Sequence, residues 1–444
     1  MIDQKSYFAS VECVARGLDP MKADLVVADP DRSRNTICLA VSPHLKAQGV
    51  KNRCRLGEIP THLPIIIAPP RMQLYIQTAA EIHGVLLKYI APEDIFTYSI
   101  DESFLDVTHY LKMYGKTARQ LAHTIMEDIR ATVGTVSSCG IGTNLYLAKV
   151  ALDILAKHAP DFIGELDEER YRQKLWRHKP LTDFWRIGPA TARRLQNRGI
   201  TTMEAVAHCD EELLYRCFGV DAELLIDHAW GREPTTIAHI KAYRSQSRSL
   251  SSTQVLMRDY RWEEGQIIVK EMTDQLCLDM AAQGLVSGGI GLYVGYSHTE
   301  GIPGSGGTAK LSQPTNAAAL IVPAVAALYR RITRRGAAIR RIGISCHDVI
   351  PDQGELQLNL FEDVHKQLKN KAIQEAMLEI RGKYGKNAIL KGTNFQPSAT
   401  GRIRNQQIGG HRSGKQDNQD PDATIPPGEA ICHVRCAEGT KGSH

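Results

Sequence analysis

Two adjacent acidic residues, Asp101 and Glu102, lie inside a segment whose other residues are typical of a β-strand. The apolar positions around the pair are Phe96, Ile100, Phe104 and Leu105. Neighbouring side chains of a strand point to opposite faces, so the pair converges on one site only near a strand end or a tight turn. The two charges repel each other and resist burial unless a cation neutralises them. On its own, such a pair favours a solvated turn between two strands.

The start of the chain supplies a third carboxylate. Asp3 follows a short apolar stretch, and the aromatic pair Tyr7 and Phe8 then opens a predicted helix. Hard oxygen ligands of this kind suit Mg²⁺, which usually completes its coordination shell with water and substrate phosphates. Three carboxylates from two separated strand ends could hold two such ions, and phosphoryl transfer from a triphosphate to a hydroxyl uses that arrangement.

Several motifs, in order and at consistent spacing, resemble those of the Y-family, or translesion, DNA polymerases, in particular the UmuC-like branch of bacteria. They occupy residues 3–12, 99–102, 140–144 and 148–149. The resemblance runs from the first residue to about Gly410 and implies an α+β multidomain fold, a right-hand polymerase with palm, fingers, helical thumb and an α/β little-finger domain. The palm would take residues 1–10 and 70–164, the fingers 11–69, the thumb 165–233 and the little finger 240–350.

Hydrophobic periodicity predicts the main elements. Strands are expected at 24–28, 37–41, 95–100, 254–257, 289–294 and 339–345, and helices at 72–89, 262–283 and 316–334. Residues 165–234 read as almost entirely helical, and the loop 300–307, with four glycines and a proline, is expected to be mobile. A helix at 364–384 would precede a polar tail, of which roughly the last thirty residues are expected to be disordered.

The resemblance implies a catalytic centre with two Mg²⁺ ions. Asp3, Asp101 and Glu102 would be the metal ligands, assisted by the main-chain carbonyl of Gln4. The family's reaction is template-directed transfer of a nucleotide from a dNTP to a primer 3′-hydroxyl, at low fidelity and opposite damaged template. Surface charges without a metal are the alternative interpretation of the three carboxylates.

Two aromatic residues and two lysines would bind the nucleotide. Phe8 occupies the position of the family's steric gate, where a ring under the sugar excludes a 2′-hydroxyl. Tyr7 reads better as a core residue, although the backbone N–H groups of Tyr7 and Phe8 at a helix N-terminus could bind phosphate. Lys46 lies where the family often has Arg, and Lys157 is one residue further from Lys149 than in many relatives. A solvated helix face is the alternative for either lysine.

Three regions are candidates for DNA binding. Residues 187–200 resemble a helix-hairpin-helix, in which Gly188 would permit the tight turn and freed amides would meet a phosphate. Arg244, Gln246 and Arg248 would share one face of a strand that enters the little finger, an arrangement suited to phosphate contacts. Six arginines at 330–341, Arg330 and Arg331 among them, favour DNA over an exposed basic strand without a partner.

A short peptide suggests a further partner. Gln357-Leu358-Asn359-Leu360-Phe361 matches the bacterial sliding-clamp binding pentapeptide. An extended peptide can place Leu360 and Phe361 in an apolar groove, with Leu358 beside them, while Gln357 fixes its register. A short edge strand is the alternative.

The composition fits an intracellular protein. The net charge of +5 is modest, and ten cysteines without a paired framework suit a reducing cytosol. The most apolar stretch, 317–329, is too short to span a bilayer and contains Pro323. We therefore expect a cytoplasmic monomer that uses primer-template DNA and dNTPs and has no membrane association.

One departure from the family supports a competing hypothesis. Only Met1 and Ile2 precede Asp3, whereas relatives begin with a longer strand, so the central strand loses ladder hydrogen bonds and buried apolar area. The alternative is a catalytically impaired, N-terminally truncated accessory protein that binds DNA and is tethered to the clamp. A nucleotide cyclase with a palm-like metal site would also explain the carboxylates, but not the thumb, the arginines or the pentapeptide.

Overall fold

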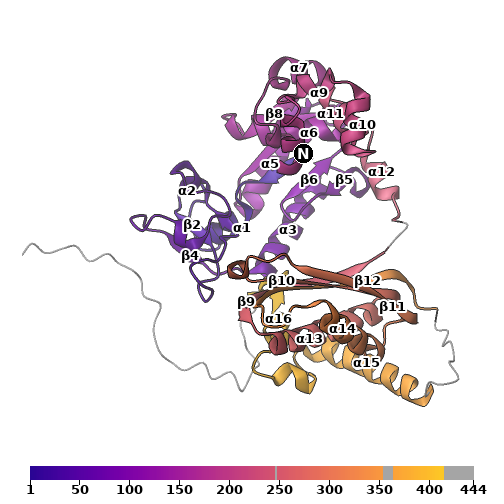
Figure 1. Ribbon diagram of the computed structural model, residues 1–444. Helices are drawn as coiled ribbons and strands as arrows, with labels where there is room; N and C mark the ends of the chain where they lie inside the picture. The colour runs from indigo at the N-terminus through magenta and orange to yellow at the C-terminus, as the bar shows by residue number, and fades with distance from the viewer. Residues whose placement is uncertain (246–247, 354–363, 415–444) are drawn as a thin grey trace, which may run out of the picture.

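The computed structural model describes residues 1–245, 248–353 and 364–414. Within these residues the chain forms a central sheet unit, two smaller units beside it and a separate sheet-and-helix unit (Figure 1). We call them palm, fingers, thumb and little finger, after the arrangement that the sequence predicts. The predicted clamp-binding pentapeptide and the predicted disordered tail lie outside the described residues.

The palm is built on a five-stranded sheet in the order β5-β6-β1-β7-β8. The short strand β1 is central, antiparallel to both neighbours, and only the β7–β8 pair is parallel. Ile2 and Cys139 pack into the core on the side of the two long helices α3 and α5. The bounds are β1 Ile2–Gln4, β5 Ile95–Thr97, β6 Glu102–Leu105, β7 Ser137–Gly142, β8 Ile163–Leu166, α3 Met72–Leu87, α4 Tyr110–Tyr114 and α5 Ala118–Val133.

Two glycines of β7 let a further helix approach the sheet closely. This helix, α6, spans Leu145–Val150. A Cβ atom on Gly140 or Gly142 would overlap the backbone of Ala148 in α6. Only glycine leaves room for such contact between strand and helix backbones. The Gly-Ile-Gly motif therefore places the next residue of α6, Lys149, against the sheet.

The fingers and the thumb are small units whose cores adjoin that of the palm. Leu147 of α6 belongs to the thumb core, and Val11 and Leu25 of the fingers belong to the palm core, while a further cluster lies within the fingers. The fingers combine a sheet in the order β3-β2-β4 with two short helices. Their elements are α1 Tyr7–Val14, β2 Leu25–Val27, β3 Ala40–Val41, α2 Pro43–Ala47 and β4 Ile66–Ala68. The thumb is helical, as the sequence predicts, with α7 Glu168–Leu175, α8 Pro189–Gln196, α9 Met203–Ala207, α10 Glu211–Phe218 and α11 Asp221–Ala229, and α12 Ile237–Ala242 follows it.

The little finger is a four-stranded antiparallel sheet, β11-β10-β12-β9, with helices on one face. The other face carries exposed side chains such as Tyr293. The loop prediction at 300–307 is wrong in part, because Ser305 already begins the edge strand β11. Its alternating burial shows an ordinary strand despite Gly306 and Gly307. The elements are β9 Leu250–Tyr260, α13 Trp262–Ala282, β10 Leu285–Tyr296, β11 Ser305–Thr315, α14 Ala318–Ile332, β12 Ile339–Pro351 and α15 Val364–Tyr384.

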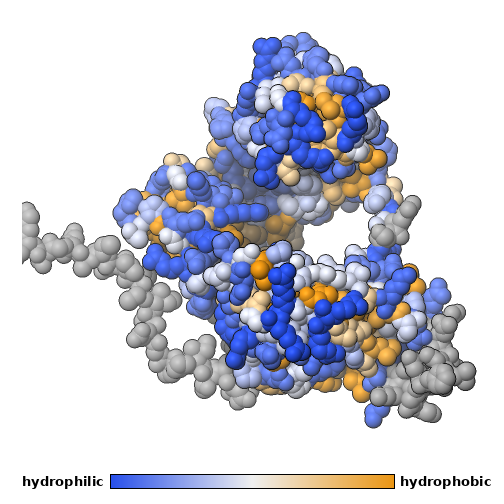
Figure 2. All heavy atoms as spheres, viewed as in Figure 1, coloured by the Kyte–Doolittle hydropathy of each residue, from blue (hydrophilic) through white to orange (hydrophobic). Residues whose placement is uncertain are grey.

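The chain after Tyr384 also folds, although the sequence predicts no element there. A 3₁₀ turn, a short helix and a hairpin of two short strands follow. Their bounds are η7 Gly392–Phe395, α16 Gly401–Asn405, β13 Gln407–Ile408 and β14 His411–Arg412. Figure 2 shows a hollow between the palm, the fingers and the little finger, with largely hydrophilic surface around it. Among the described residues no helix has the length and apolar content needed to cross a bilayer, and all eight cysteines there are free thiols.

Candidate active site

The strand register places three carboxylates beside one another. Asp3 of β1 lies directly opposite Glu102 of β6. The next residue of β1, Gln4, donates its N–H to the carbonyl of Asp101 at 3.1 Å. Directly opposed residues of an antiparallel pair have Cβ atoms about 5 Å apart. The residues that sequence reasoning drew from two distant segments are therefore neighbours at one end of the central strand pair.

The electrostatics of Asp3 show that these charges act on one another. Burial, together with the charges of Asp101 and Glu102, raises the pKa of the Asp3 carboxyl to about 7. A carboxyl group held among like charges is stabilised by any cation that enters. The carboxylate cluster therefore favours the binding of a cation.

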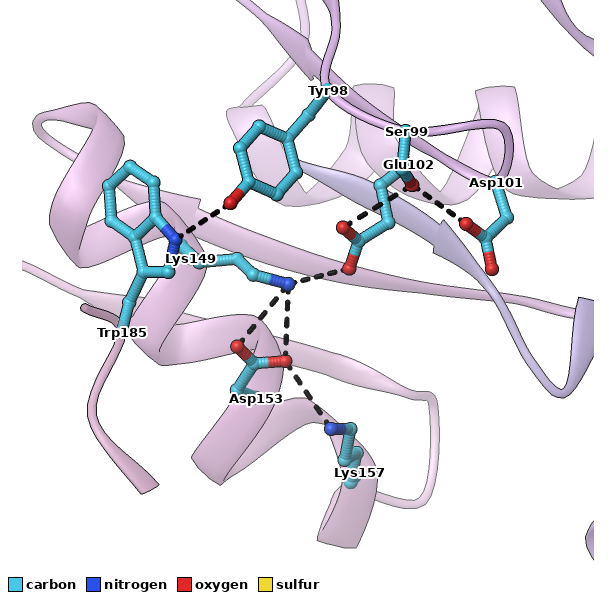
Figure 3. A network of polar contacts seen from close by, with 8 residues as sticks. All are labelled: Tyr98, Ser99, Asp101, Glu102, Lys149, Asp153, Lys157 and Trp185. Atoms are coloured by element: carbon cyan, nitrogen blue, oxygen red, sulfur yellow. Dashed lines mark hydrogen bonds and ion pairs between the residues drawn. The ribbon is translucent and has the colours of Figure 1, made fainter. Parts of the chain in front are cut away.

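The counter-charge present is a lysine of α6 (Figure 3). Lys149 Nζ lies 2.5 Å from Glu102 Oε1 and 3.3 Å from Asp153 Oδ2. Asp101 instead accepts a hydrogen bond from the Ser99 hydroxyl at 2.7 Å. The same hydroxyl lies 3.5 Å from Glu102 Oε2, so Ser99 links the two carboxylates (Figure 3). In the described part of the chain no group of three or more acidic, His or Cys side chains is placed to hold a metal ion. The donor set still fits Mg²⁺, because all three groups are hard oxygen ligands with mutual repulsion to relieve.

A group of lysines adjoins the carboxylates. Burial lowers the pKa of Lys46, and the charges of Lys157 and Lys5 lower it further, while Asp3 acts in the opposite direction. The pKa of Lys5 is likewise lowered, first by burial and also by Lys157. Lys46 and Lys157, both predicted, are therefore within electrostatic range of Asp3, and so is Lys5, which sequence reasoning missed. Its position directly after Gln4 in the strand was the available signal.

An irregular helical turn precedes Lys157 and affects where its side chain lies relative to Asp3. Residues Ala151–Leu155 form a π-helical turn directly after α6. A π turn closes its hydrogen bonds one residue later than an α turn and so takes up one extra residue. It therefore accommodates the spacing between Lys149 and Lys157 that is one residue longer than the family pattern. Lys157 also forms an ion pair with Asp153 at 3.3 Å.

Tyr7 and Phe8 have different environments. The hydroxyl of buried Tyr7 donates to the carbonyl of Tyr75 at 2.6 Å, which matches the core interpretation for Tyr7. Phe8 is only partly buried, and its ring stacks on the Tyr75 ring with centroids 4.7 Å apart. The helix that they open has no side-chain cap, and Ser6 before it adopts a left-handed φ of 51°. Its first N–H groups are therefore available to an anion.

Gln4 can take part only through its main chain. Its side chain is buried and accepts hydrogen bonds from the hydroxyls of Thr135 at 2.8 Å and Ser137 at 3.1 Å. This agrees with the expectation that its carbonyl, not its amide group, would assist the metal ligands.

The candidate DNA-binding residues lie in several different settings. Gly188 caps α8, but its φ is −79° and a Cβ there would meet nothing within 4 Å, so the turn does not require glycine. Arg244 and Arg248 precede the first strand residue, Leu250, so the predicted shared strand face is wrong for the described residues. Arg330 and Arg331 lie in the last turn of α14, within the helical layer of the little finger.

The chain is similar to known proteins over most of its length. The model of the impB/mucB/samB family matches residues 2–153, and that of the family's C-terminal domain matches residues 247–360. UvrX of Bacillus subtilis (strain 168), named for UV-damage repair, is 32% identical over 416 residues, covering 93% of this chain and 97% of UvrX. DNA polymerase IV 2 of the same organism is 27% identical over 414 residues, covering 93% and 98%. The Y-family DNA polymerase chimera Dbh-Dpo4(243-245)-Dbh superposes with a TM-score of 0.61 at 21% identity over 79% of this chain and 98% of that chain, and so supports the fold alone.

Proposed function

Because the chain belongs to the Y family of DNA polymerases, we propose that it catalyses template-directed, low-fidelity DNA synthesis across damaged template. The observation that carries the proposal is the register of β1 and β6, which sets Asp3 opposite Glu102 and next to Asp101. Primer-template DNA and dNTPs are the proposed substrates.

We assign Asp3, Asp101 and Glu102, with the main-chain carbonyl of Gln4, as the groups that would hold two Mg²⁺ ions. When bound, the ions supply the positive charge that clamps the attacking and leaving oxygens of phosphoryl transfer. The raised pKa of Asp3 supports this assignment, because like-charged carboxyls gain most from a cation. Lys149 would stabilise Glu102 while no ion is bound.

The triphosphate would lie over the group formed by Lys5, Lys46 and Lys157. Burial, and to a smaller extent the charge of Lys157, lowers the pKa of Lys5 and Lys46. An anion between these lysines would stabilise their charged forms. The uncapped N-terminus of α1 adds backbone donors to the same end of the site.

Phe8 is the proposed barrier to ribonucleotides. Its stacking on Tyr75 gives the ring a rigid backing, which exclusion of a single hydroxyl requires. Phe8→Ala should therefore allow extension with ribonucleotides, measured as the ratio of kcat/KM for a dNTP to that for the matching rNTP. Tyr7→Phe is the matched control, because it removes only the hydroxyl that bonds Tyr75. An unchanged ratio in Phe8→Ala would remove Phe8 from this role.

Primer extension with Mg²⁺ on damaged and undamaged templates tests the proposal directly. Asp101→Ala should abolish extension and leave DNA binding nearly intact. Asp106→Ala is the control, since this exposed carboxylate lies at the far end of β6 and bonds only Thr108 nearby. Full activity of Asp101→Ala would refute the metal assignment.

A DNA-binding accessory protein without catalysis is the second candidate. It is favoured by the ion pair between Lys149 and Glu102, at 2.5 Å, which gives Glu102 a counter-charge from the chain itself. The primer-extension assay distinguishes the two candidates, because an accessory protein binds primer-template DNA without extending the primer.

The remaining assignments concern partners. We propose that Gly188, Arg244, Arg248, Arg330 and Arg331 contact the DNA backbone and that residues 357–361 bind the sliding clamp. Loss of clamp-stimulated extension on Leu360→Ala with Phe361→Ala, at unchanged extension without clamp, would support the second of these.

A further inference from the structure

We propose that residues 392–414 form a strap that ties the little finger to the fingers and to the start of α3, and that Arg412 and Ser413 are positioning residues for the nucleotide site. The family models end before this segment, and nothing in the sequence predicts it. Its link to nucleotide choice rests on the proposed function, whereas the tie itself is a property of the fold.

The strap is fixed at its base to the little finger. The N–H and the hydroxyl of Thr400 both donate to Glu271 Oε1 on α13, at 2.7 and 2.6 Å. Arg404 donates to Gln254 at 2.9 Å and to Ser252 at 3.2 Å, both on β9. Glu271 and Thr400 are buried. The base is therefore part of the little-finger packing.

The hairpin β13–β14 then reaches the fingers. Arg412 forms ion pairs with Asp29, at 2.9 Å, and with Asp31. In return, Arg32 of the fingers donates to the carbonyl of Gly410 at 2.7 Å. Asp29 is 10% exposed at its side chain, so this contact is more sheltered from solvent than a typical surface pair.

The end of the strap completes a helix beneath the candidate nucleotide site. Helix α3 begins at Met72, and its N-cap residue, Arg71, provides no side-chain cap. The carbonyl of Ser413 accepts a hydrogen bond from the N–H of Gln73 at 2.8 Å. It thereby satisfies one of the donors that a helix start leaves without a partner. Gly414 packs against Arg71 so closely that a Cβ there would lie 2.7 Å from the Arg71 Cβ.

From Arg71 a continuous series of contacts leads to Phe8. Arg71 donates twice to the buried carboxylate of Glu12, at 2.9 and 2.7 Å. Glu12 also accepts the hydroxyl of Tyr75 at 2.7 Å, and the Tyr75 ring stacks on Phe8. The strap therefore contacts the residue, Arg71, that is linked through Glu12 to Tyr75, and the Tyr75 ring supports the proposed steric gate, Phe8.

Arg412→Glu in the full chain tests the tie, because it sets like charges against Asp29 and Asp31. Hydrogen exchange at the first turn of α3 should become about 3- to 10-fold faster. Arg402→Ala is the matched control, since this arginine of the same strap packs over Phe395 within it. Arg412→Glu combined with Asp31→Arg should return exchange toward the wild-type rate. Unchanged exchange in Arg412→Glu would overturn the proposal.

A second readout separates positioning from general destabilisation. If the strap positions the gate, Arg412→Glu should lower the discrimination between dNTP and rNTP several-fold, whereas a merely structural role leaves that ratio unchanged. An unchanged ratio would overturn the positioning role. The exchange measurement needs no catalysis, so it still decides the tie if the wild-type chain extends no primer and the proposed function fails.

Discussion

Two carboxylates in this molecule show opposite electrostatic behaviour. In the palm, the pKa of Asp3 is raised to about 7, because it is buried beside Asp101 and Glu102. In the little finger, the pKa of Glu264 is lowered to about 2 by donors that surround it, above all Arg258 at 2.6 and 3.2 Å. A carboxylate whose hydrogen-bond and ion-pair partners are all supplied by the fold, such as Glu264, contributes to stability. A carboxylate buried beside other carboxylates, such as Asp3, favours a cation from outside the chain and is a candidate functional group.

The largest expected effect is a difference in primer extension between variants of the palm carboxylates and of Glu264. Glu102→Gln removes one of the clustered charges and should lower kcat for primer extension by about 100- to 1,000-fold, the range found when one electrostatic contact to a reacting centre is lost. Glu264→Gln should leave kcat of the folded enzyme unchanged. The measurement is single-nucleotide incorporation at saturating dNTP. Equal losses in both variants would erase the distinction.

The next effect concerns the lysine that stands beside the palm carboxylates. Lys149→Met keeps the length of the side chain but leaves Glu102 unpaired, and its side chain is only 8% exposed. We expect a loss of about 3 kcal/mol in unfolding free energy in EDTA, as for other broken buried pairs. Lys157→Met, at 51% exposure, should cost less than about 0.5 kcal/mol.

Mg²⁺ provides the check on that comparison. If the carboxylates bind the ion, adding Mg²⁺ should restore more stability to Lys149→Met than to the wild type, because the ion replaces the missing charge. The readout is the urea midpoint with and without Mg²⁺. Equal gains in both proteins would show that Lys149 and the cation do not share a site.

The sequence was a good guide where its pattern is local. Helices α3 and α13 lie within two residues of their predicted bounds, because each is long and has buried apolar residues at helical spacing. The carboxylate cluster was also predictable, because the order and spacing of the motifs indicated that Asp3, Asp101 and Glu102 lie together. Edge strand β11 was not, because its glycines suggest a loop, and only pairing with β10 gives them strand conformation.

Long-range contacts were beyond sequence reasoning. Arg412 and Asp31 form an ion pair although they are 381 residues apart in the sequence, and no sequence motif near either residue predicts the contact. The contribution of Lys5 was hidden for a similar reason: its partners Lys46 and Lys157 come from separate units. The extra residue between Lys149 and Lys157 was visible in the sequence, but the π turn that accommodates it was not.

A smaller effect tests the palm side of the comparison by pH. The pKa of Asp3 is raised on folding, so its charged form disfavours the folded state at any pH above its ordinary value. Asp3→Asn should therefore gain about 2 kcal/mol over the wild type in EDTA at pH 8. The gain should shrink as the pH falls from about 7 and vanish below about pH 4. Thermal melts of both proteins across this range measure it, and a pH-independent difference would contradict the assigned cause.

The smallest effect tests the little-finger side, and its sign is opposite. Glu264 accepts hydrogen bonds from Arg258, the N–H of Arg261 at 2.8 Å and Ser398 at 2.9 Å, which favour its charged form in the folded state. Glu264→Gln should therefore destabilise the little finger at neutral pH, by about 1 kcal/mol, since a group this close to solvent is screened. Because the folded pKa is lowered, the wild-type advantage is full above about pH 4.5 and is lost as the pH falls toward about 2. Hydrogen exchange in α13 between pH 3 and 7 would resolve it. Added salt should reduce the advantage too, whereas an advantage that grows on acidification would place Glu264 with the palm carboxylates.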